Sequence, residues 1–166
     1  IVHYGGDGGD QSMYRKGWLH FFHNTVVSTR SGNTTLLRLS TNAESADVRN
    51  NVLFGTAGGS AFAICAGQGT VELHTNWLRT DWRDTHESTL EGSVTDHGDN
   101  VTGADPGFTD AGNQDFTLAG GSACLDQAGA LHPDAASYAA DQQYTVHQGV
   151  TLRPDDGAPD IGAFER

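Results

Sequence analysis

Four asparagines recur through the first part of the chain at nearly constant spacing. Each ends a short pattern in which apolar and polar residues alternate, and a short apolar stretch follows it. The asparagines are Asn24, Asn51, Asn76 and Asn100, so the repeat is about 24 to 27 residues long. Self-similarity at such a period is typical of solenoids, whose repeats stack as successive coils.

Each repeat contains short apolar runs bounded by Gly, Asn, Ser, Thr and Asp, a pattern that indicates strands and turns. We expect strands at residues 25–28, 35–40, 52–55 and 61–65. Three strands in one repeat describe a coil of a parallel β-helix, whereas a propeller blade needs about 40 residues and a leucine-rich repeat shows a Leu-x-x-Leu-x-Leu frame. The sequence therefore predicts an all-β solenoid, with a Greek-key sandwich as the alternative.

The repeated asparagine has a structural explanation. At a sharp turn, asparagine tolerates left-handed backbone angles and bonds neighbouring backbone groups. In stacked coils the equivalent side chains lie at the strand spacing of about 4.8 Å, so their amides can bond one above another. We expect a ladder of these four residues, and contact with a ligand is the alternative role.

The C-terminal third carries four further motifs. They are Asp-Pro-Gly-Phe at 105–108, Asp-Phe-Thr-Leu at 115–118, Gly-Ser-Ala-Cys-Leu-Asp-Gln-Ala-Gly at 121–129 and Pro-Asp-Ile-Gly-Ala-Phe-Glu at 159–165. This series resembles the ending of bacterial right-handed parallel β-helix proteins, a group that includes pectate-lyase-like and other secreted polysaccharide-processing proteins. Ala123 stands where that ending usually has proline, and Phe164 where it usually has tyrosine.

The resemblance sharpens the fold prediction. It implies a right-handed parallel β-helix of about four coils over residues 1–103, with an irregular C-terminal capping segment over 104–166 in the same domain. Members of the group usually have many more coils, so we expect the C-terminal fragment of a larger, secreted, extracellular or cell-surface bacterial protein. The implied function is polysaccharide binding or lyase-like processing, and a non-catalytic structural or adhesion module is the alternative.

Candidate catalytic residues come from the resemblance to lyases of this fold. Such lyases place a Ca²⁺ site and an arginine or lysine base on one outer sheet face, and the base removes a proton next to a uronate carboxylate. Alternation along the third strand of each repeat puts His3, Arg38 and Glu91 outward on the corresponding face. Arg38 is the only base among them, and a surface or ion-paired arginine is the alternative interpretation.

Candidate substrate-binding residues lie on the first strand of each repeat. The same alternation puts His20, Asp47 and Glu72 in one outward column and Phe22, Arg49 and His74 in the next. Acid, base and aromatic groups side by side could grip a sugar. A solvent-facing side of a solenoid must also be polar, so a purely structural face is the alternative.

Metal binding has little support in the sequence. No Cys-x-x-Cys or His-Glu-x-x-His spacing is present, so we expect no metal site of those kinds. Residues 5–10 match the beginning of a Gly-Gly-x-Gly-x-Asp calcium repeat, but no tandem copy follows and a flexible loop is favoured. Calcium is the one cofactor we consider, and only for a lyase-like protein.

Charge and composition restrict the partners. Nine basic residues stand against 21 acidic ones, a net charge of −12, which argues against nucleic acid because a phosphate binder needs a basic surface. No apolar stretch reaches the ~18 residues of a membrane helix. Cys65 and Cys124 could form one disulfide or remain two buried thiols.

Self-association is expected from the solenoid itself. Strand edges that begin near Ile1 and Leu19 would carry unpaired backbone groups at the N-terminal end of the coils. Two such ends packed face to face would make an isologous homodimer. The alternative is that residues 5–17 fold over this end as a lid.

Overall fold

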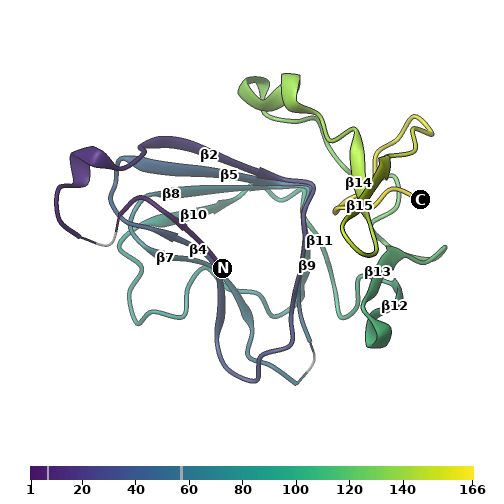
Figure 1. Ribbon diagram of the computed structural model, residues 1–166. Helices are drawn as coiled ribbons and strands as arrows, with labels where there is room; N and C mark the ends of the chain where they lie inside the picture. Colours follow the sequence, from purple (N-terminus) through teal and green to yellow (C-terminus); the bar gives the residue numbers. More distant parts are fainter. Residues whose placement is uncertain (7, 57) are drawn as a thin grey trace.

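Three parallel sheets form the body of the protein. The computed structural model describes residues 1–6, 8–56 and 58–166 (Figure 1). Sheet A contains β1 (Val2–Tyr4), β4 (Thr34–Leu39) and β7 (Phe62–Gly67). Sheet B contains β2 (Gly17–Phe22), β5 (Glu44–Arg49), β8 (Thr70–His74) and β10 (Ser93–Asp96). Sheet C contains β3 (Thr25–Ser28), β6 (Val52–Gly55), β9 (Trp77–Arg79) and β11 (Val101–Gly103).

Every strand in these sheets pairs in parallel with the equivalent strand of the neighbouring repeat. The chain therefore winds as a parallel β-solenoid, which confirms the predicted fold class. The solenoid has about three turns, where the sequence predicted about four coils. The difference arises because the third strand of the third repeat is reduced to a bridge between Ala63 and Arg83, and the fourth repeat contributes only β10 and β11.

The interior of the solenoid is filled by apolar side chains from all three sheets. Alternation along β5 turns Ala46 and Val48 inward, while Asp47 and Arg49 lie on the outer face. The fully buried residues of this core are Leu36, Leu37, Leu39, Ala46, Val48, Leu53, Phe62, Ile64, Cys65, Val71, Leu73 and Leu78. Burial of this surface is the main force that holds the coils together.

The four repeated asparagines lie at the turn between sheets B and C, joined side chain to side chain. The amide nitrogen of Asn24 donates to Asn51, that of Asn51 to Asn76 and that of Asn76 to Asn100, over 2.9 to 3.0 Å. The left-handed backbone angle expected at these asparagines lies one residue earlier, at His23, Asn50 and Thr75, with φ of 51°, 57° and 49°. The asparagine side chain closes the turn around that residue, since Asn51 also donates to Arg49 O.

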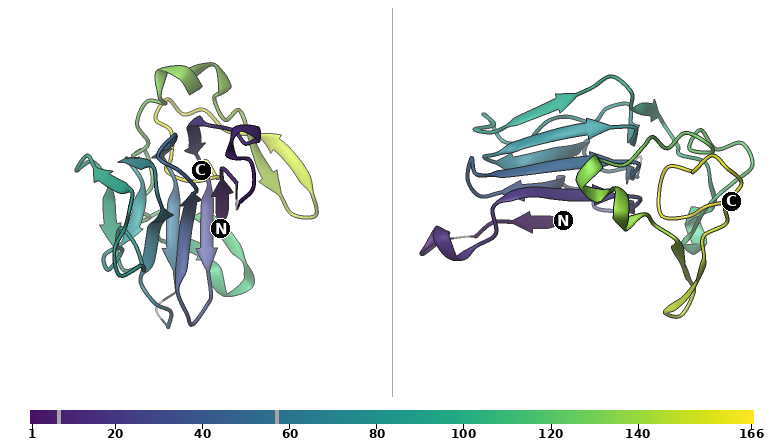
Figure 2. Two further views of the ribbon diagram at one scale, coloured as in Figure 1. Left: turned by 90° about the vertical axis from the view of Figure 1, so that its left-hand side faces the viewer. Right: turned by 90° about the horizontal axis from the view of Figure 1, so that it is seen from above.

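Residues 104–166, which we call the tail, lie beside the solenoid. Figure 1 and the view from above in Figure 2 show them along the outer side of sheet C. The tail contains the antiparallel hairpins β12–β13 (Phe108–Asp110 and Asp115–Leu118) and β14–β15 (Gln142–Thr145 and Gly149–Leu152). Short 3-10 helices are η1 (Gln11–Met13) between β1 and β2, and η2 (Ala111–Asn113) and η3 (Pro133–Tyr138) in the tail.

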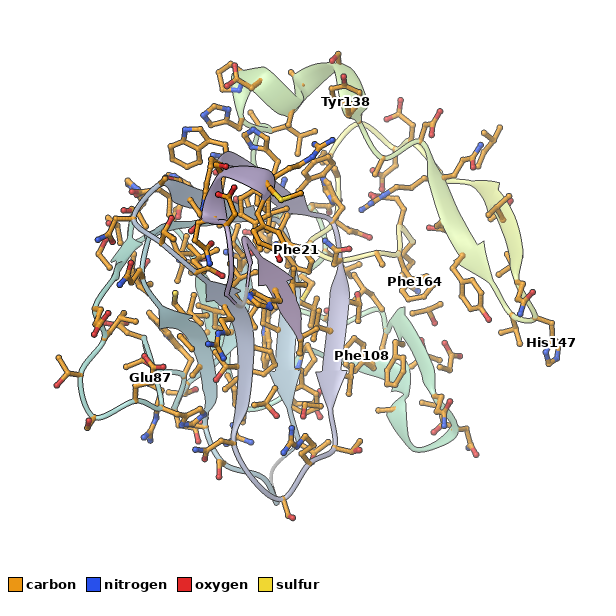
Figure 3. The ribbon with its side chains drawn as sticks, turned by 60° about the vertical axis from the view of Figure 1, so that its left-hand side comes forward. Phe21, Glu87, Phe108, Tyr138, His147 and Phe164 are labelled. Atoms are coloured by element: carbon orange, nitrogen blue, oxygen red, sulfur yellow. The ribbon has the colours of Figure 1, made fainter. Side chains whose placement is uncertain are left out.

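A second apolar cluster joins the tail to sheet C. Its fully or nearly fully buried members are Val52, Trp77, Leu118, Cys124 and Ile161. Phe108 of β12 packs edge-on against Phe54 with ring centres 6.1 Å apart (Figure 3). The outer face of sheet C can therefore carry apolar side chains, since the tail shields them from water.

One glycine fixes how closely the tail approaches the coils. Gly162 has φ of 107° and donates its N–H to Asn50 O. A Cβ at this position would lie 2.9 Å from Thr25 Oγ1. The glycine of the Asp-Ile-Gly motif thus supplies both a left-handed backbone angle and room for the coil.

The two cysteines are free thiols in different clusters. Cys65 lies in the solenoid interior and Cys124 in the cluster beneath the tail. Burial raises the thiol pKa of each to about 11. Of the two alternatives given by the sequence, the structure shows two buried thiols. Within the described residues, no helix has the length and apolar character needed to cross a membrane.

Candidate binding face on sheet B

The outer face of sheet B carries the side chains that sequence spacing grouped into two columns. Strand pairing sets His20 beside Asp47 and Asp47 beside Glu72. The second column contains Phe22, Arg49 and His74. The predicted register of the candidates is therefore correct, and their part in binding stays a prediction.

An arginine and an aspartate form the centre of this face. Asp47 is only 1% exposed, and both of its carboxylate oxygens accept hydrogen bonds from Arg49, at 2.8 Å from Nε to Oδ2 and 2.5 Å from Nη2 to Oδ1. The remaining Nη1 donates to Ala130 O at 2.8 Å. The hydrogen bonds of Arg49 are therefore structural, and they link Asp47 on sheet B to Ala130 in the tail.

Strand β8 and the residues that end or follow β8 and β10 form two histidine–carboxylate pairs. His97 Nε2 lies 2.6 Å from Glu72 Oε2, and His74 Nδ1 lies 3.3 Å from Asp99 Oδ2. The His74 and His97 rings stack with centres 3.9 Å apart and planes at 14°. His97 and Asp99 were missed in the sequence because the fourth repeat is degraded, although they occupy the repeat positions after β10.

A segment of the tail crosses the opposite end of the face. His132, the N-cap of η3, packs between the first-coil rings, 4.8 Å from His20 and 5.8 Å from Trp18 between ring centres. Trp18 remains 47% exposed beside them. Figures 1 and 2 show η3 lying over the edge of the sheet next to β2. An exposed indole, four imidazoles and the carboxylates of Glu72 and Asp99 therefore share one elongated surface.

The catalytic candidates do not form one group. His3 of β1 pairs in register with Arg38 of β4 on sheet A, as predicted, and His3 Nε2 lies 2.9 Å from Ser40 Oγ. Glu91 is elsewhere, in the segment before β10, where it accepts a 2.9 Å hydrogen bond from Gln68 Nε2. Its predicted position on the same face is wrong because Arg83, not the residues around Glu91, forms the fourth rung of sheet A.

A pocket of about 540 Å³ lies between the first coil and the tail. His23 forms its coil side, and Leu131, Asp141, Arg153 and Glu165 are among the tail residues that line it. Burial first, and the nearby charge of Arg153 second, lower the pKa of His23 to about 4. No sequence pattern indicated this pocket, because its walls come from segments that share no repeat.

A buried ion pair stabilises the tail side of the pocket. Arg153 Nε lies 2.7 Å from Glu165 Oε2, and the two side chains are 6% and 3% exposed. Glu165 also accepts from Asp160 N, and Arg153 Nη2 donates to Asp160 O. The pair is fully engaged in holding the Asp-Ile-Gly-Ala-Phe-Glu ending in place.

The Gly-rich segment considered for calcium gives no cluster of ligands among its described residues. Asp7 lies outside the described residues, and Asp10 caps η1 by accepting hydrogen bonds from Ser12 N and Oγ. In comparisons with known proteins, no family model, no curated protein and no solved structure matches this chain.

Proposed function

We propose that the outer face of sheet B binds a polysaccharide chain that lies along the solenoid. The observation that carries this proposal is the half-exposed Trp18 ring at one end of a face that, apart from Phe22, is lined by hydrogen-bonding side chains. An indole offers a flat apolar surface to a sugar ring, and carboxylates and imidazoles at strand spacing can bond its hydroxyls. The tail motifs support the same idea through their resemblance to secreted, pectate-lyase-like β-helix proteins of bacteria.

The charge of the face favours a neutral polysaccharide over an acidic one. Among the residues of strands β2, β5, β8 and β10, Arg49 is the single lysine or arginine, and it is bound to Asp47 and Ala130. Glu72 and Asp99 add negative charge at the other end. A polyuronate would meet repulsion here, and the net charge of −12 adds to it.

We propose that this face binds polysaccharide without catalysing a reaction. The His97–Glu72 pair resembles an imidazole oriented by a carboxylate, as general bases often are. Elimination in a uronate also requires a positive group to neutralise the substrate carboxylate, and on this face Arg49 is already neutralised by Asp47. Lyase-like processing is therefore an alternative outcome of the test rather than the proposal.

The test is affinity electrophoresis in gels that contain neutral polysaccharides such as xylan, galactan or glucan, with pectin and alginate beside them. We expect retardation by at least one neutral polymer, and a roughly 10-fold loss of affinity in Trp18→Ala because one aromatic stacking contact contributes about 1–1.5 kcal/mol. Tyr144→Ala is the matched control, since Tyr144 is 52% exposed but belongs to the β14–β15 hairpin.

The other results would overturn the proposal in different ways. Retardation by acidic polymers alone, with release of unsaturated products, would establish a lyase. Equal loss in both variants would show that Trp18 is not the contact. An absence of retardation in every gel would leave the structural or adhesion module as the function.

A further inference from the structure

Three potential metal ligands from distant parts of the chain meet at the edge of sheet B. They are His20 of β2 and His132 and Asp134 at the start of η3, and one ligand atom from each lies within 4.8 Å of the others. Over the part of the chain that the structure describes, this is the one group of three or more such side chains. Its members are two imidazoles and one carboxylate.

Independent contacts hold the two halves of this group together. Arg49 donates to Ala130 O at 2.8 Å, and Asn50 exchanges hydrogen bonds with Gly129 N and O at 2.9 and 2.7 Å. Trp18 stacks on both imidazoles, with ring centres 6.4 Å from His20 and 5.8 Å from His132. The ligands are thus brought together by residues that are not ligands, as a preorganised site requires.

A buried carboxylate lies beside His20 and can orient its ring toward the tail. His20 Nδ1 is buried without a hydrogen-bond partner, although most buried polar atoms have one. The nearest carboxylate oxygen, Asp47 Oδ2, is 3.6 Å away and is held by Arg49. A small ring rotation would let Nδ1–H donate to Asp47 and leave Nε2 to face the tail. Carboxylate–histidine–metal arrangements of this kind orient the ligand and raise its basicity.

We propose that His20, His132 and Asp134 bind one divalent transition-metal ion, for which Zn²⁺ has the matching chemistry. Two nitrogens and one oxygen suit Zn²⁺, with water in a fourth position, whereas Ca²⁺ takes six to eight oxygen ligands. Bonds of about 2.0–2.1 Å require ligand atoms about 3.3 Å apart in a tetrahedron. Asp134, whose side chain is 71% exposed, has the freedom to make that adjustment.

Metal binding would replace one weak local contact. His132 Nδ1 accepts from Asp134 N–H at 3.2 Å and lies 3.8 Å from the Asp134 carboxylate. An ion at Nδ1 would take the place of that N–H and draw the carboxylate inward. The result is a metal staple between the first coil and the tail. This inference shares His20 with the face proposed for polysaccharide, but it does not rest on that proposal, because its test involves no glycan.

The test is titration of chelator-stripped protein with Zn²⁺ and, separately, Ca²⁺ in a calorimeter. We expect one Zn²⁺ per chain and no comparable Ca²⁺ binding. Loss of a residue that only orients a ligand lowers metal affinity by about 10- to 100-fold, so loss of a ligand itself should cost ~100-fold in His20→Gln and in His132→Gln. His147→Gln is the control, because His147 lies at the tip of the β14–β15 hairpin, away from the solenoid (Figure 3).

Hydrogen exchange gives a second readout that surface binding would not produce. Zn²⁺ should slow amide exchange at residues 130–138 in the native protein and leave the β14–β15 hairpin unchanged. Zn²⁺ binding that is equally strong in His20→Gln, His132→Gln and His147→Gln would show scattered surface histidines and overturn the proposal. If amide exchange at residues 130–138 does not respond to Zn²⁺, the ion does not link the first coil to the tail, and the proposal is wrong.

Discussion

The coils and the tail are held together in different ways. In the coils, each strand bonds to the same strand of the next repeat, so one pattern satisfies the backbone of every turn. The tail has only two short hairpins, and one apolar cluster together with individual hydrogen bonds fixes it to sheet C. The coils are therefore stabilised by repetition, whereas the tail depends on contacts that each occur once.

Two adjacent asparagines show the difference most clearly. Asn51 bonds within the coils, to Asn24, Asn76 and the backbone of its own and the preceding turn. Asn50 bonds both backbone groups of Gly129 and so reaches the tail. Asn50 also accepts from Thr75 Oγ1 within the coils, but it is the member of the pair that reaches the tail, so substitution of Asn50 tests the attachment of the tail and substitution of Asn51 tests the coils.

The largest effect should come from Asn51→Ala. The substitution leaves Phe21 O, Arg49 O and Asn24 N without their partner in a buried turn. Each buried unsatisfied group costs about 1–3 kcal/mol, so we expect a loss of roughly 4 kcal/mol in the free energy of unfolding. That is a large part of the stability of a single domain. Urea denaturation followed by circular dichroism measures it.

Asn100→Ala is the comparison for that variant. Asn100 is the last member of the stack and is only partly buried, so water can replace its bonds to Asn76. We expect a loss of about 1 kcal/mol. Equal losses in Asn51→Ala and Asn100→Ala would contradict the view that burial inside the repeat gives the stack its strength.

The second effect should be confined to the tail. Asn50→Gly keeps the left-handed backbone at φ of 57° but removes the side-chain bonds to Gly129 and Thr75. We expect the tail to lose roughly 3 kcal/mol of its attachment to the coils. Limited proteolysis should cut between residues 130 and 158 far faster than in the unmodified protein, while the circular dichroism of the strands is retained. Loss of both signals together would mean that coils and tail unfold as one unit.

The coils could be predicted from sequence because their rules are local and repeated. The strands expected at 25–28 and 52–55 coincide with β3 and β6, and parallel in-register pairing turned equal spacing into the columns of sheet B. Glu91 was misplaced because the long segment before β10 departs from the period. A pattern that repeats once per coil cannot describe the residues that interrupt it.

The motifs in residues 104–166 led us to expect a capping segment, but they did not predict where the tail lies against the coils. Contacts such as Asn50 with Gly129, or His20 with His132, join single residues more than 70 positions apart. Neither partner has a spacing that distinguishes it from other polar residues. The pocket and the candidate metal site both lie along this junction, so sequence patterns alone could not locate them.

Acid should weaken the junction next, by a smaller amount. His23 has a pKa of about 4 in the folded protein and about 6.5 when unfolded. Above pH 6.5 it is neutral in both states and costs nothing. Between pH 6.5 and 4 the unfolded chain binds a proton that the folded protein resists, so stability falls as pH falls. At pH 5 the loss is about 2 kcal/mol, from about 1.36 kcal/mol per pKa unit.

His23→Asn isolates this contribution, because asparagine accepts the positive φ of 51° but has no group that titrates near pH 5. Urea denaturation at pH 7 and pH 5 should show a drop about 2 kcal/mol smaller in His23→Asn than in the unmodified protein. Identical drops would mean that His23 is protonated in the folded protein at pH 5, and that carboxylates elsewhere account for the acid sensitivity.

The smallest effect concerns the N-terminal end of the coils. Strands β1, β2 and β3 are the outer strands of their sheets, and interior residues Leu19 and Phe21 are only partly buried there. Such edges pair with other chains, and we predict a weak homodimer that joins two of these ends. At a protein concentration a few times the dissociation constant it adds only about 1 kcal/mol of stability.

Light scattering over a concentration series, in salt that screens the net charge of −12, measures this association. Phe21→Lys places a charge at the end itself, where the long side chain can still reach water, and should return the protein to a monomer. Tyr144→Lys adds the same charge on the exposed hairpin of the tail and should leave the dimer intact. A monomer mass at every concentration would show that the end of the coils is stable without a partner. If both variants disrupt the dimer equally, the added charge itself prevents association, and the dimer contact is not at the strand edges.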